Sequence, residues 1–63
     1  MISVKIKDGP VEYPAVINED CITFARPVLL ANNTTDPTNT MVQLIAGEWL
    51  RITEPYDEFI KRV

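Results

Sequence analysis

The chain has 63 residues, 46% of them apolar, and carries six basic against nine acidic side chains, which gives a net charge of −3. This length predicts one small domain, residues 1–63. A core of this size supplies at most roughly 3–5 kcal/mol of stability without disulfides, a metal or self-association. A single cysteine excludes an internal disulfide, and the absence of histidine leaves no plausible zinc or transition-metal site.

The start of the chain predicts two strands. Apolar and polar residues alternate over residues 2–7, which is the period of a half-buried strand with a charged outer face. Residues 8–10 break this pattern, and a second alternating set follows over residues 11–17. Because Pro14 cannot donate a backbone hydrogen bond, we expect the second strand at an edge of the sheet or at a bulge.

A third strand and a polar loop come next. Residues 21–28 predict a strand with Ile22 and Phe24 on the same face, after a turn at residues 18–20. Nothing apolar follows in the segment 32–40, so residues 31–39 predict an exposed loop with a type I turn at residues 36–39. This loop is either a simple connection or a binding loop.

Residues 40–53 predict a β-hairpin. Residues opposite each other in an antiparallel pair share a face, so the loop length decides which side chains lie together. A three-residue loop at residues 45–47 pairs Val42 with Leu50 and gives one apolar face, whereas a two-residue loop divides it. That apolar face consists of Val42, Leu44, Leu50 and Ile52. The longer loop also places Gly47 where the turn needs a positive φ.

A short helix is expected at residues 55–63. Pro55 suits the first helical position, and Asp57 and Glu58 complement the helix dipole in the first turn. The helix has one apolar stripe, formed by Tyr56, Phe59, Ile60 and Val63. Because so short a helix is unstable alone in water, we expect it to dock on the sheet through Phe59 and Ile60.

These elements predict an α+β fold, a small antiparallel β-sheet meander of four to five strands with one C-terminal α-helix packed on one face. The order strand, glycine turn, strand, then Glu54-Pro55-x-Asp57-Glu58-Phe59-Ile60 resembles the C-terminal half of the small flagellar and swarming-motility proteins FlbD and SwrD. The likeness covers residues 40–60. It implies a bacterial regulatory role linked to motility, and an unrelated small bacterial or phage regulator fits the residues equally well.

No side chain of the sequence predicts catalysis. Cys21 has acidic neighbours and no histidine to deprotonate it, so we interpret it as a half-buried strand residue. The acidic pairs at residues 19–20 and 57–58 have structural reasons to lie in a turn and at a helix start. We therefore expect no enzyme, catalytic residue, cofactor or metal.

The face of the hairpin opposite its apolar side chains is the candidate site. It carries Met41, Gln43, Trp49 and Arg51. Aromatic, methionine and arginine side chains are enriched in protein interfaces, and one helix covers only one face of a sheet. Trp49 is thus either part of a protein-binding surface, for a partner or for a second copy in a homodimer, or a shield formed with neighbouring strands.

We expect a non-enzymatic interaction module, an adaptor or regulator in the cytoplasm, because the sequence shows no secretory signal and no membrane span. The alternative is a nucleic-acid-binding regulator that stacks bases on Phe24, Trp49 and Arg51. The negative net charge and the scattered basic residues argue against this alternative.

Overall fold

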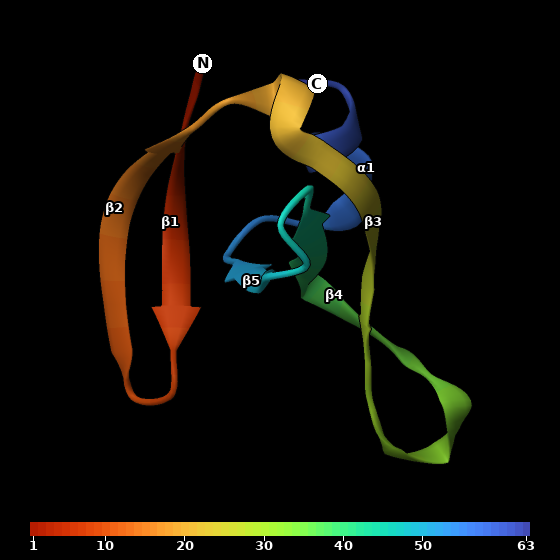
Figure 1. Ribbon diagram of the computed structural model, residues 1–63. Helices are drawn as coiled ribbons and strands as arrows, with labels where there is room; N and C mark the ends of the chain where they lie inside the picture. Colours follow the sequence, from red (N-terminus) through yellow and green to blue (C-terminus); the bar gives the residue numbers. More distant parts are fainter.

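The computed structural model describes residues 1–63 and contains one five-stranded antiparallel sheet with a short C-terminal helix (Figure 1). The elements are β1 (Ile2–Asp8), β2 (Val11–Ile17), η1 (Glu19–Cys21), β3 (Ile22–Leu29), η2 (Ala31–Asn33), β4 (Thr35–Leu44), β5 (Trp49–Ile52) and α1 (Tyr56–Ile60). This architecture confirms the predicted antiparallel sheet with one C-terminal helix.

The strand order is β2-β1-β5-β4-β3, so the strands do not form the one continuous meander that was expected, and the sheet consists of two pieces. One piece is the hairpin β1–β2 and the other is the run β3–β4–β5. The pairing of β1 with β5, where Ile6 lies opposite Ile52, joins them. Strands β2 and β3 therefore lie at opposite edges, and the segment with η1 crosses one end of the sheet between them (Figure 1). The edge position of β2, which contains Pro14, is as predicted.

The hairpin β4–β5 has the predicted register. Val42 lies opposite Leu50 and Gln43 lies opposite Trp49. The loop is closed by the Gly47 N–H, which donates to the Leu44 carbonyl at 2.8 Å. Gly47 has a φ of 96°, the left-handed conformation that the turn was expected to require.

Replacing Gly47 by valine should destabilise the fold by about 1 kcal/mol or more, because a β-branched residue is strained at that φ. No atom lies within 4 Å of the position that a Cβ would occupy, so the strain comes from the backbone and not from a clash. Urea denaturation measures the loss. Ile45→Val changes an exposed residue of the same loop and should leave the stability nearly unchanged. Equal stabilities for the two variants would contradict the turn assignment.

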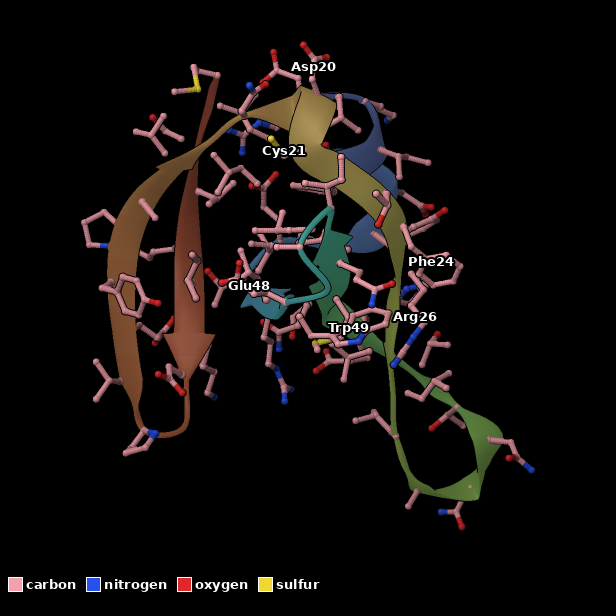
Figure 2. All side chains as sticks on the ribbon, viewed as in Figure 1. Asp20, Cys21, Phe24, Arg26, Glu48 and Trp49 are labelled. Carbon is pink, nitrogen blue, oxygen red and sulfur yellow. The ribbon has the colours of Figure 1, made fainter.

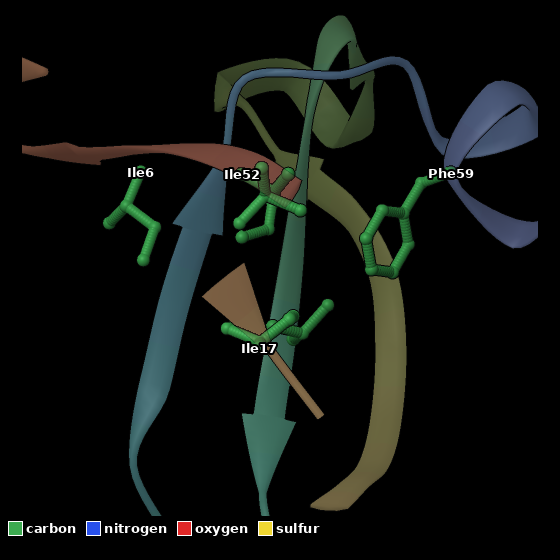
Figure 3. Close-up of a cluster of buried hydrophobic side chains, with 6 residues drawn as sticks. Ile6, Ile17, Ile52 and Phe59 are labelled. Carbon is green, nitrogen blue, oxygen red and sulfur yellow. The ribbon is translucent and has the colours of Figure 1, made fainter. Parts of the chain in front are cut away.

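The core lies on one face of the sheet, here called the inner face. Six buried side chains form it, and Figure 3 shows the cluster: Val4, Ile6, Ile17, Val42, Ile52 and Phe59. Thr40 is also fully buried, and its hydroxyl donates to the Glu54 carbonyl at 2.8 Å. This bond satisfies the buried hydroxyl and fixes the chain just before α1.

The helix docks through Phe59, which is completely buried, whereas Ile60 is 41% exposed. The prediction that Ile60 also docks is therefore wrong, and so is a helix reaching residue 63, since α1 ends at Ile60. After α1 the chain makes one further turn, in which the Arg62 N–H donates to the Phe59 carbonyl at 2.9 Å. The Arg62 guanidinium bonds the Glu54 carboxylate and the Ser3 carbonyl, which ties this tail to β1 while Ile60 stays at the surface.

Strand β3 contains a bulge that changes the face of Phe24. Ile22 lies opposite Leu44 and Phe24 lies opposite Gln43, so Thr23 is an extra residue in the pairing. The Thr23 hydroxyl donates to the Gln43 carbonyl at 3.2 Å. Ile22 packs against the core while Phe24 points away from it, and the prediction that they share a face is wrong.

The predicted loop over residues 31–39 is shorter than expected. Strand β4 begins at Thr35, and only Leu30, η2 and Thr34 remain as the connection. The pairing shifts between Pro27–Thr40 and Leu29–Thr35, so residues 36–39, here called the 36–39 bulge, arch out of the ladder. The Asp36 carboxylate organises this arch, because it accepts hydrogen bonds from the Thr38 N–H at 2.8 Å and from the Asn39 amide at 2.9 Å.

Candidate functional site

The four predicted binding residues lie together on the outer face of the sheet, the face opposite the core. Two rows of side chains cross β3, β4 and β5 there. We call the six residues the outer patch: Phe24, Gln43 and Trp49 in one row, and Arg26, Met41 and Arg51 in the next. Neither of the two surface hollows of the molecule includes a residue of this patch, so it is an open surface and not a pocket.

Trp49 is the centre of the outer patch. Its ring meets that of Phe24 edge to face, with centroids 5.9 Å apart and planes at 78°. The Arg26 guanidinium carbon lies 5.3 Å from the Trp49 ring centroid, a cation–π contact (Figure 2). Trp49 is nevertheless 44% exposed and Phe24 is 50% exposed. The indole is thus held in place by β3 while a large part of it faces solvent.

Sequence reasoning missed Arg26 and placed Phe24 on the wrong face relative to Ile22. Both residues reach the outer patch because the bulge at Thr23 shifts the alternation of β3 by one residue. A threonine inside a strand carries no signal of its own for a bulge. Simple alternation from Ile22 would place Phe24 opposite Val42 on the inner face, whereas the shift places Ala25 there.

Arg51 links the outer patch to the 36–39 bulge. Its Nη2 lies 3.2 Å from the Asp36 Oδ2, and the Asp36 side chain is only 12% exposed. The hydrogen bond from the Thr38 hydroxyl, then those from the Asn39 amide and the Thr38 N–H, hold the pKa of Asp36 well below its usual range, and the Arg51 charge adds to this. Arg51 is therefore paired with a carboxylate whose ionised form is favoured.

Replacing Asp36 by asparagine should remove a pH-dependent part of the stability. A carboxyl whose folded pKa is depressed stabilises the fold fully above its unfolded pKa, about 3.9, and loses that contribution as the pH falls through the folded pKa. Wild type should therefore lose stability below about pH 4 more steeply than Asp36→Asn does. Urea denaturation over this pH range is the measurement. Parallel pH profiles for the two proteins would show that Asp36 is not held as described.

The outer face as a whole is basic. Lys5 and Lys7 point outward because they alternate along β1 with Val4 and Ile6, which are buried. Together with Arg26 and Arg51 they place four of the six basic side chains of the chain on this face. The sequence shows these residues as scattered, and the pairing of β1 with β5 is what brings them to one side.

Two polar side chains near η1 have structural partners. The Glu19 carboxylate lies 2.7 Å from the N-terminal amine, and the hydrogen bond from that amine lowers the pKa of Glu19. The Asn18 side chain accepts from the Asp20 N–H at 3.0 Å, which caps η1. Cys21 is a free thiol and is half-buried as expected, but it is the last residue of η1 and does not lie in the third strand as predicted.

No three Cys, Asp or Glu side chains gather where they would hold a metal ion. The single α-helix, at five residues, is far too short to cross a membrane. The chain matches no protein-family model, no curated protein and no solved structure. The geometry and charge of the outer patch are therefore the basis for a functional proposal.

Proposed function

We propose that this chain is a non-enzymatic interaction module, a small adaptor or regulator, that binds another protein through the outer patch. The observation that carries the proposal is Trp49, which is 44% exposed at the centre of a patch that also holds an exposed phenylalanine and two arginines. Tryptophan and arginine are the residues most often found as binding hot spots, and the interface core is enriched in aromatic side chains.

The layering of the fold supports this proposal. Phe59 of α1 packs on the inner face, and the buried apolar residues of the strands point to the same side. No second layer covers the outer face, so its aromatic side chains are not needed to fill the core. The strands also hold the patch rigidly, since each of its residues lies in a paired position of β3, β4 or β5. A rigid surface loses little conformational entropy when it binds.

A cytoplasmic regulator of bacterial or phage origin is part of the same proposal. The likeness to FlbD and SwrD over residues 40–60 supports it, because this segment folds as two strands around Gly47 followed by α1. Function is carried by sites and not by folds, so the outer patch and not the likeness is what an experiment must address.

The test is affinity capture from a bacterial lysate with wild type, Trp49→Ala and Tyr13→Ala side by side. Tyr13 is a matched control because it is an aromatic residue of similar exposure, 40%, on β2 and outside the outer patch. We expect proteins that wild type and Tyr13→Ala retain and Trp49→Ala loses. Equal capture by all three proteins would contradict a binding role for the patch.

A nucleic-acid-binding regulator is the second candidate, favoured by one observation. The outer face combines two exposed aromatic rings with four basic side chains, the groups that stack bases and pair with phosphates. Fluorescence anisotropy with a labelled thymine oligonucleotide tests it. Binding that weakens steeply with salt would support this candidate, and the absence of binding at low salt would remove it.

A further inference from the structure

The outer face differs in charge from the rest of the molecule. It carries four of the six basic side chains but only two of the nine acidic ones, namely Glu12, which lies opposite Lys7, and Asp36, which bonds Arg51. The other acidic residues lie in turns, at the end of β1 or around α1. An acidic chain with a net charge of −3 therefore presents a basic surface around its exposed tryptophan.

We propose that the outer patch binds a linear acidic segment of another protein. An apolar side chain of the segment packs against the exposed parts of Trp49 and Phe24. Carboxylates on either side of it pair with Arg26 of the patch and with Lys7 of β1, which the pairing of Ile6 with Ile52 places beside Arg51. This inference rests on the proposed function and specifies its partner by chemistry.

Arg26 is the residue of the patch that is best positioned to bind a carboxylate. Its guanidinium lies over the Trp49 ring, and only Nη1 has a protein acceptor, the Pro27 carbonyl at 3.2 Å. A guanidinium has five N–H donors in one plane, so a group stacked on an aromatic ring keeps its edge free for a bidentate carboxylate. A carboxylate bound there lies beside the exposed indole, where charge and apolar contact act on the same short segment.

The charge of the patch disfavours the two other occupants. A symmetric dimer through this face would bring the same surface of both copies together, so the basic side chains would face one another. A nucleic acid needs a groove or track of free cations along its backbone. Here the patch is open, and Arg51 is already paired with Asp36.

The test is selection from a phage-displayed library of random linear peptides on immobilised wild type. We expect the selected peptides to be enriched in Asp and Glu around an apolar residue. Trp49→Ala should weaken their binding about thirtyfold or more, the effect of losing a hot spot. Arg26→Glu and Lys7→Glu should each weaken it about tenfold, and the loss should shrink with added salt. Lys61→Glu is the matched control, because it makes the same change of charge on an exposed residue after α1.

The outcomes separate this inference from the proposed function. Peptides that depend on Trp49 but carry no excess of acidic residues would overturn the acidic partner and leave the binding patch standing. Equal peptide affinities for Arg26→Glu and Lys61→Glu would likewise overturn the acidic partner and leave the binding patch standing. If the library yields no peptide whose binding depends on Trp49, the inference that the partner is a linear segment is wrong. A wild-type dimer in sedimentation that Trp49→Ala dissolves, or a thymine oligonucleotide that binds more tightly than every peptide, would assign the patch to another occupant and overturn the inference.

Discussion

Phe59→Ala should destabilise the protein by about 3–5 kcal/mol, which is as much as a core of this size supplies in total. Phe59 is completely buried in the cluster that also contains Val42 and Ile52, and it is the only buried residue of α1. A helix of five residues has no stability of its own, so it stays helical only while this side chain is docked. Circular dichroism during thermal unfolding should show a variant that is largely unfolded at room temperature.

Phe24→Ala is the matched control for this prediction. It removes the same side chain from the outer face, where half of it is exposed, and should cost about 1 kcal/mol, mainly the edge-to-face contact with Trp49. A Phe59→Ala variant that melts within a few degrees of wild type would show that α1 is peripheral to the fold.

Ile52→Ala should cost about 2–5 kcal/mol, because Ile52 is completely buried at the centre of the sheet. It lies opposite Ile6 of β1 on one side and opposite Thr40 of β4 on the other. This residue therefore joins the hairpin β1–β2 to the run β3–β4–β5, and its truncation opens a cavity where the two pieces meet. Urea denaturation measures the loss in free energy of unfolding.

Ile45→Ala removes the same atoms from the loop between β4 and β5, where the side chain is 74% exposed. Its stability should stay within about 0.5 kcal/mol of wild type. If Ile52→Ala and Ile45→Ala lost similar amounts of stability, the packing of Ile52 between β1 and β4 would not be what holds the two pieces of the sheet together.

The parts of the fold that follow from local pattern were predictable. The register at Val42 and Leu50 follows from the requirement that the apolar side chains share one face, and the edge position of β2 follows from Pro14. The pairing of β1 with β5 is a contact between the two ends of the chain, and no periodicity within either strand encodes it. The bond of Arg62 to Ser3 is likewise a contact between the two ends of the chain, 59 residues apart, and the periodicity of the helix does not encode it.

For the candidate site, too, only the part that follows from local pattern was predictable. Parity within the hairpin places Met41, Gln43, Trp49 and Arg51 on one face, and they lie there. The contribution of β3 was not predictable by simple alternation, because the bulge at Thr23 reverses it. The basic character of the outer face was hidden as well, since it arises only when β1 is paired beside β5.

On our proposal, the inner face stabilises the fold while the outer patch is free to bind. Unfolding of Trp49→Ala in urea is the most direct test of this division. We expect a folded variant with an unchanged circular dichroism spectrum and a loss of about 1–2 kcal/mol, which covers the contacts of the indole with Phe24 and Arg26. A loss of about 3–5 kcal/mol, equal to that expected for Phe59→Ala, would make Trp49 a core residue and would contradict the binding patch.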